Sequence, residues 1–113
     1  LDKSPNMKVH AVQYNTHLYE ARDLLAHSKL EPNCLPPKVH FKHSTKCRLI
    51  LKDLPEEVYN REWDVIMIDG PAGYLRELPG RMAVIFTVAV MARLRTRPGA
   101  THVILHDVNR RVE

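Results

Sequence analysis

The sequence has no apolar run long enough to cross a bilayer. Its longest run, Met82 to Ala92, is interrupted by Thr87 and falls far short of the roughly 20 residues that a membrane-spanning helix needs. No signal peptide and no nucleic-acid-binding module are recognisable, and the basic residues behind the net charge of +4 are spread along the chain. We therefore expect no nucleic acid as a partner. A solvated surface is the simplest explanation of the charge, and a polyanionic carbohydrate would suit it as well.

Cysteine is scarce, with only Cys34 and Cys47, which flank a loop rich in proline and histidine. In an oxidising compartment they would close a short disulfide worth about 3 kcal/mol. Two free buried thiols fit the sequence equally well. His40 and His43 would complete a tetrahedral zinc set, but Cys-x12-Cys with both histidines inside is not a usual zinc spacing. The disulfide and the free thiols stay open as alternatives.

The length of 113 residues allows at most one small domain, and 44% apolar with 27% charged residues is an ordinary globular composition. The chain begins at Leu1 rather than Met, and it ends at Glu113, where a helix is expected to start. We therefore expect residues 1–113 to be one piece of a longer protein.

Two short apolar runs, Trp63 to Asp69 and Thr101 to Asp107, each end in an aspartate. Such nearly unbroken runs are typical of strands buried on both faces in a parallel sheet. Between them, Pro79-Gly80 opens the apolar stretch from Arg81 to Arg93, whose basic end favours a buried helix. A strand–helix–strand crossover predicts parallel, neighbouring strands. Both carboxylates would then lie at the edge of the sheet where α/β proteins bind ligands.

The other elements are weaker predictions, and together they indicate an α/β fold of the doubly wound type. Pro32, Pro36 and Pro37 predict a loop over residues 29–46. The remaining expected elements are a strand over Val9 to Tyr14; a helix over Leu18 to His27, capped by Asn15 or Thr16, with Leu18, Ala21, Leu24 and Leu25 inward; a strand over Arg48 to Leu51; and a brief helix capped by Asp53, with Val58 and Tyr59 inward.

A series of longer motifs runs through the second half of the chain. They are Trp63-Asp64-Val65-Ile66-Met67-Ile68-Asp69-Gly70-Pro71, Gly73-Tyr74, Glu77-Leu78-Pro79-Gly80-Arg81-Met82, Met91-Ala92-Arg93, and Thr101-His102-Val103-Ile104-Leu105-His106-Asp107-Val108-Asn109-Arg110-Arg111-Val112-Glu113. With weaker matches at Tyr14, Thr16, Glu20-Ala21 and Leu24-Leu25, the chain resembles the plant glucuronoxylan 4-O-methyltransferase family of polysaccharide-biosynthesis proteins. Leu75 and Arg76 depart from the aromatic residue and the proline expected there, and these departures are expected to alter how the acceptor fits.

The resemblance implies a fragment of a Rossmann-like methyltransferase domain, a parallel sheet with flanking helices. Residues 1–113 would hold its third to fifth strands, without the N-terminal cofactor loop or the C-terminal strands, and would be inactive alone. The implied whole protein is a type II Golgi membrane protein with its anchor outside this fragment. It would transfer a methyl group from S-adenosylmethionine to O4 of glucuronic acid on xylan. The alternative is a non-catalytic Golgi protein that assists xylan synthesis by binding the polymer or partners.

The resemblance also assigns the site. Asp69 and Asp107, with His106 beside them, are the expected catalytic residues, and Asp69 and Asp107 are expected to hold a divalent metal ion that activates the acceptor hydroxyl. Arg81 would read the sugar carboxylate and Tyr74 would stack on a sugar ring. Asn15, Thr16, Asp69 and Gly70 would lie against the cofactor.

Structural alternatives stand beside five of these assignments. Asp69 would cap the following loop, and Asp107 would cap a helix that begins at Asn109. His106 would be a packed histidine, Arg81 would form a surface salt bridge with Glu77, and Tyr74 would belong to the core.

Overall fold

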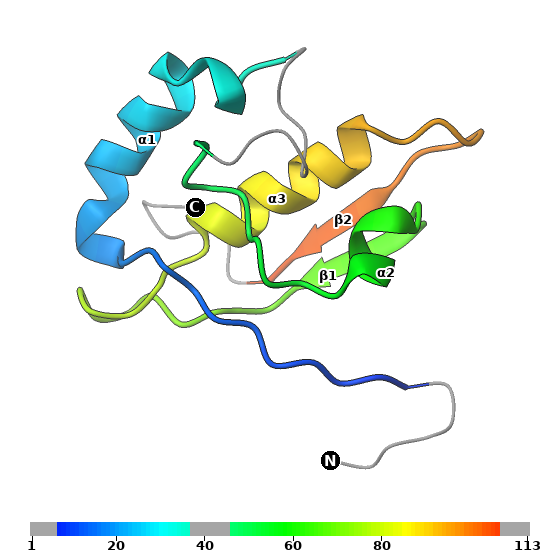
Figure 1. The fold of residues 1–113 in the computed structure, drawn as a ribbon. Helices are drawn as coiled ribbons and strands as arrows, with labels where there is room; N and C mark the ends of the chain where they lie inside the picture. The colour runs from blue at the N-terminus through cyan, green and yellow to red at the C-terminus, as the bar shows by residue number, and fades with distance from the viewer. Residues whose placement is uncertain (1–6, 37–45, 107–113) are drawn as a thin grey trace.

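A two-stranded parallel sheet and the helix that connects its strands form the centre of the structure (Figure 1). The computed structural model describes residues 7–36 and 46–106. Strand β1 is Val65–Ile68, helix α3 is Met82–Arg93 and strand β2 is His102–Leu105. Val65 lies opposite His102, and Ile68 lies opposite Leu105. The predictions of two parallel, neighbouring strands and of the helix between them are confirmed.

Helix α3 forms despite its many β-branched residues because one side of it is buried. Its buried residues recur at helical spacing: Ala83, Thr87, Val88 and Val90. Gly80 precedes the helix with φ of 70°, a backbone conformation that glycine adopts without strain. The expectation that Pro79-Gly80 marks the start of this helix is therefore confirmed.

The sheet is not buried on both faces, contrary to the expectation. Ile68 is 3% exposed, whereas Val65 and Met67 are 57% and 64% exposed. Side chains alternate between the two faces of a strand, and α3 packs against β1 on one of them. Within residues 7–36 and 46–106, the structure contains no second layer over the Val65 and Met67 face.

The first half of the chain is helical or irregular. The elements are η1 (Leu18–Glu20), α1 (Ala21–Leu30), η2 (Pro32–Cys34) and α2 (Glu56–Asn60). The expected strand over Val9 to Tyr14 is wrong, because in the described part of the chain the sheet consists of β1 and β2 alone and residues 9–14 pair with neither. No described helix is both long and apolar enough to span a membrane.

The helix predicted from Leu18 starts as the 3-10 turn η1 and continues as α1. Neither Asn15 nor Thr16 caps it; the N-cap is His17, whose backbone N–H donates to the Glu20 carboxylate at 3.0 Å. Leu24 is buried as expected. Leu25 is 50% exposed, so its inward orientation was predicted wrongly.

The predicted strand over Arg48 to Leu51 is a turn and a bend. Leu49, Ile50 and Leu51 are all buried, and three consecutive buried residues do not follow the two-residue alternation of a half-covered strand. The cap of the next helix is wrong as well, since Pro55, not Asp53, precedes α2. Tyr59 packs inward as expected and donates its hydroxyl hydrogen bond to the carbonyl of Leu51.

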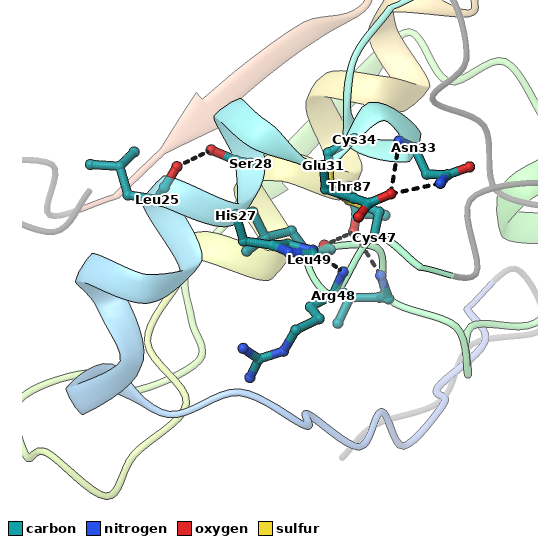
Figure 2. The surroundings of a disulfide bond; sticks show 11 residues. Leu25, His27, Ser28, Glu31, Asn33, Cys34, Cys47, Arg48, Leu49 and Thr87 are labelled. Atoms are coloured by element: carbon teal, nitrogen blue, oxygen red, sulfur yellow. Dashed lines mark hydrogen bonds between the residues drawn. A yellow bond between two sulfur atoms is a disulfide. The ribbon is translucent and has the colours of Figure 1, made fainter.

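A disulfide joins Cys34 of η2 to Cys47, 13 residues further along the chain (Figure 2). Cys34 is 3% exposed and Cys47 is fully buried within the core cluster. Of the two open alternatives, the structure therefore contains the disulfide. The zinc interpretation is wrong because both sulfur atoms are consumed by this bond; His40 and His43 lie outside the described residues.

Candidate functional site

The carboxyl ends of β1 and β2 bring Asp69 and His106 together. The backbone N–H of His106 donates to the carbonyl of Ile68 at 3.0 Å, which extends the strand register by one residue. Nδ1 of His106 then lies 2.7 Å from Oδ1 of Asp69. Both side chains remain more than half exposed, at 56% and 61%. The two polar groups thus face solvent at the edge of the sheet where α/β folds bind ligands.

The sequence set Asp69 beside Asp107 and added His106 to them, and the structure brings His106 to Asp69. The register places His106 directly after Leu105 and across from Asp69. The ion pair differs from both structural alternatives, a loop cap for Asp69 and a packed core position for His106. Asp107 lies outside the described residues, so its roles as a metal ligand and as a helix cap stay predictions.

Arg81 connects the start of α3 to the same edge. Its side chain is buried, at 3% exposure, and its Nη1 donates a hydrogen bond to the backbone carbonyl of His106. This burial contradicts the surface salt bridge with Glu77. The predicted contact of Arg81 with a sugar carboxylate stays a prediction.

The loop from Gly70 to Gly80 leads away from Asp69 and returns to Arg81. Tyr74 in this loop is 76% exposed, which contradicts the core alternative and leaves its stacking on a sugar ring as a prediction. An added Cβ at Gly70 would meet nothing within 4 Å, so the backbone next to Asp69 is open to approach. The loop closes on itself through the N–H of Gly80, which donates to the carbonyl of Ala72 at 3.0 Å.

A segment from the first half of the chain fastens this loop, which the sequence did not predict. The backbone N–H of Leu18 donates to the carbonyl of Leu78 at 2.7 Å, and that of Tyr19 to the carbonyl of Arg76 at 3.2 Å. These are backbone contacts between segments about 60 residues apart, which no local pattern encodes.

The charge on Glu20 helps to hold this segment. The Arg48 guanidinium, followed by hydrogen bonds from His17, keeps the pKa of the Glu20 carboxyl below its ordinary value. The side chain therefore stays ionised at neutral pH and joins η1 to the segment that follows Cys47.

Asn15 and Thr16, the expected cofactor residues, lie just before η1. Asn15 is exposed, whereas Thr16 is 3% exposed. The Thr16 hydroxyl oxygen has no hydrogen-bond partner among the residues that the structure describes. A buried hydroxyl without a partner is uncommon in native proteins. Contact of these two residues with an adenine ring stays a prediction.

Comparison with known proteins identifies the family. The sequence profile of the IRX15/IRX15L/GXM family matches residues 1–113, the whole chain. The chain belongs to this family. The resemblance drawn from the motifs is thereby confirmed at the level of the family, although not for its glucuronoxylan members in particular.

Three relatives from Arabidopsis thaliana show the range of the family. The chain is 54% identical to Arabinogalactan O-methyltransferase 1 over 97% of its own length and 38% of the relative. It is 44% identical to Protein IRX15-LIKE, over 96% of the chain and 35% of the relative. It is 41% identical to Glucuronoxylan 4-O-methyltransferase 2, over 98% of the chain and 37% of the relative. The chain thus spans less than two fifths of these relatives. No solved structure matches it.

Proposed function

We propose that the full-length protein is an S-adenosylmethionine-dependent O-methyltransferase of a plant cell-wall polysaccharide. The observation that carries the proposal is the 54% identity to an arabinogalactan O-methyltransferase over 97% of the chain. The exposed Asp69–His106 pair at the carboxyl edge of parallel strands supports it, since polar groups at this edge are typical of α/β active sites. We further propose that the two strands belong to a larger Rossmann-like sheet, of which residues 1–113 form a part.

Asp69 and Gly70 at this edge, and Thr16 before η1, have properties that suit the methyl donor. When bound, S-adenosylmethionine supplies a methyl group on a positively charged sulfur. The exposed carboxylate of Asp69 suits a nearby cation, the open backbone at Gly70 allows close approach, and the buried hydroxyl of Thr16 offers a polar contact. Asn15, exposed beside Thr16, is the further residue that we assign to cofactor binding.

We propose arabinogalactan as the first candidate acceptor. Identity is 54% to the arabinogalactan enzyme and 41% to the glucuronoxylan enzyme. Leu75 and Arg76, which depart from the pattern that the resemblance to the glucuronoxylan family implies, lie in the exposed loop after β1. Transfer to O4 of glucuronic acid on xylan remains the second candidate, with Tyr74 on a sugar ring and Arg81 on the carboxylate.

A lumenal location in the Golgi, inferred from the resemblance, is part of this proposal. The disulfide between Cys34 and Cys47 supports it, because disulfides persist in oxidising compartments.

A divalent metal ion held by Asp69 and Asp107 is a further proposal. Among the described residues, only His27, Cys34 and Cys47 form a cluster of three metal-ligating types, away from this edge and with both sulfur atoms bonded to each other.

The non-catalytic alternative rests on Protein IRX15-LIKE, at 44% identity, whose name states no activity.

A transfer assay separates the catalytic from the non-catalytic function. The full-length protein would be incubated with labelled S-adenosylmethionine and with arabinogalactan, glucuronoxylan oligosaccharides or unsubstituted xylan, each with and without a chelator. We expect label in arabinogalactan and none in unsubstituted xylan. Label only in glucuronoxylan would select the second acceptor, and chelator sensitivity would support the metal. A folded protein that labels no acceptor would favour the non-catalytic role.

A further inference from the structure

The ring of Tyr19 lies exposed in η1 and rests against the ring of His17. The two ring centroids are 5.0 Å apart and the ring planes are 15° from parallel, yet Tyr19 remains 57% exposed. Nδ1 of His17 lies 3.2 Å from Oε1 of Glu20, which Arg48 also binds. The Tyr19 ring is therefore an apolar surface that is held in place before any ligand arrives, and this lowers the entropy cost of binding.

Two exposed arginines, Arg22 and Arg76, lie next to Tyr19. Arg22 follows it by three residues, one turn of the helical segment, and lines the same surface groove. Arg76 lies in the loop after β1, where its carbonyl accepts a hydrogen bond of 3.2 Å from the backbone N–H of Tyr19. Two segments that are distant in the sequence thus bring two guanidinium groups to the neighbourhood of one aromatic ring.

Both guanidinium groups are available to a ligand. Among the residues that the structure describes, neither of them forms an ion pair or donates a hydrogen bond. Asp23 and Glu77 directly follow the two arginines in the sequence, but within the same part of the chain neither carboxylate pairs with them. Glu20, the acid of η1, already binds Arg48. The positive charge at this surface therefore suits an anionic ligand.

This surface lies along the loop that leaves the candidate site. Figure 1 shows the loop after β1 running from the end of that strand to the start of α1 and returning to α3. Asp69 lies where the loop begins, and Tyr19 lies against its middle, at Arg76. A polymer that extends along this loop from Asp69 places another of its sugars at Tyr19.

We propose that Tyr19, Arg22 and Arg76 form a subsite for an acidic sugar of the acceptor polysaccharide, separate from the sugar that is methylated. The inference rests on the proposed function, which supplies the polymer. The C–H face of a sugar ring packs against an aromatic ring, and a guanidinium binds a carboxylate through two parallel hydrogen bonds. A surface with both groups fits a carboxylated sugar better than a neutral sugar, which carries no charge, or a phosphate, which has no apolar face.

Binding is measured first, because it does not depend on catalysis. The full-length protein would be titrated by calorimetry with arabinogalactan and glucuronoxylan oligosaccharides that carry several glucuronic acid residues. The same oligosaccharides, with their carboxyl groups reduced to alcohols, are the matched ligands. We expect the reduced forms to bind the wild type about tenfold more weakly or worse, the ratio for loss of a charge-assisted hydrogen bond. Equal affinity for the acidic and reduced forms would overturn the proposal.

Variants assign the effect to this surface. Arg22→Gln combined with Arg76→Gln should lower the affinity for the acidic form by about tenfold or more and leave that for the reduced form unchanged. Tyr19→Ala should weaken the binding of both forms, whereas Tyr19→Phe, which keeps the ring, should bind like the wild type. Arg93→Gln combined with Arg97→Gln is the matched control, because it removes two exposed arginines at the far end of α3. Wild-type affinity in the first double variant or in Tyr19→Ala would overturn the subsite.

Folding of each variant would be verified by its urea midpoint, with Tyr19→Leu as the second choice for removing the ring. The two hydrogen bonds that η1 makes with the loop after β1 are backbone bonds, so none of these substitutions removes one.

Binding and transfer together separate this inference from the proposed function. If the wild type transfers methyl groups and the Arg22→Gln, Arg76→Gln double variant binds like the wild type, the subsite is overturned and the methyltransferase stands. If the wild type binds as expected but labels no acceptor, the proposed methyl transfer fails and the sugar-binding surface stands with the non-catalytic function. A wild type that binds none of the acidic oligosaccharides would overturn the subsite.

Discussion

Thr87 of α3 and the backbone of Leu51 are joined by a buried hydrogen bond of 2.9 Å from the Leu51 N–H to the threonine Oγ1. The same hydroxyl donates to the carbonyl of Leu49 at 3.1 Å, and Thr87 is only 1% exposed. The segment from Leu49 to Leu51 is neither helix nor strand, so its buried backbone groups need partners outside a ladder. The hydroxyl of Thr87 supplies two of these partners.

We expect Thr87→Val to lower the free energy of unfolding by about 1–3 kcal/mol, because it preserves the shape but leaves a buried donor and acceptor unpaired. Denaturant unfolding would measure the loss. Thr87→Ser is the matched control, since it keeps the hydroxyl and removes only a methyl group. A valine variant more stable than the serine variant would contradict this account.

The disulfide should contribute to the free energy of unfolding by an amount comparable to the loss expected for Thr87→Val. Linking Cys34 to Cys47 closes a loop with a sequence separation of 13 residues, for which chain entropy predicts about 3 kcal/mol. We expect a reducing agent to lower the urea midpoint of the wild type. The double variant Cys34→Ser with Cys47→Ser should start at the lower midpoint and be insensitive to the reductant. Equal midpoints for oxidised and fully reduced wild type would show that the bond is not stabilising.

The parts of the fold predicted correctly from the sequence are those with a local cause. The Pro79-Gly80 start and the continuous apolar stretch are enough to define α3. The Val9–Tyr14 and Arg48–Leu51 segments have strand-like composition, but a strand also needs a neighbour at hydrogen-bonding distance, and no short window shows whether it exists. The disulfide is similar, because its formation depends on two segments that meet only in the folded chain.

The candidate site also combines features with a local cause and features that depend on how distant segments meet in the folded chain. Asp69, at the end of the first apolar run, lies at the carboxyl end of β1 as expected, but its partner depends on the register of the two strands. The observed pairing of Val65 with His102 leaves the two runs one residue out of step, which sets His106 across from Asp69. A shift by one residue exchanges the side chains on a face, and the length of a crossover helix does not fix it.

Gly80 is expected to be sensitive to substitution. Its φ of 70° disfavours any side chain, and an added Cβ would lie 3.3 Å from Cδ1 of Leu18. We expect Gly80→Ala to lower the unfolding free energy by about 1–2 kcal/mol, the cost of the left-handed conformation. Gly70→Ala is the control for stability, because its Cβ would meet nothing within 4 Å. Similar thermal midpoints for Gly80→Ala and Gly70→Ala would show that the left-handed backbone conformation at Gly80 does not make that position sensitive.

Glu62 should make the protein sensitive to acid. Its carboxylate accepts hydrogen bonds of 2.8 Å from the backbone N–H groups of Thr96 and Arg97, just after α3. These donors hold the pKa of Glu62 below its ordinary value. Since the folded-state pKa is the lower one, the stabilisation is present above the unfolded pKa of about 4.3 and is lost as the pH falls through the folded pKa.

We therefore expect Glu62→Gln to be less stable than the wild type at pH 7, and the difference to shrink as the pH is lowered from about 5 to 3. At low pH the wild-type carboxyl is protonated and resembles the neutral amide of the variant. Thermal unfolding midpoints across this range would measure both curves. Glu56→Gln, which removes an exposed carboxylate of α2, controls for the change in net charge. If the Glu62→Gln and wild-type curves stay parallel down to pH 3, the two backbone hydrogen bonds do not depend on the ionisation of Glu62.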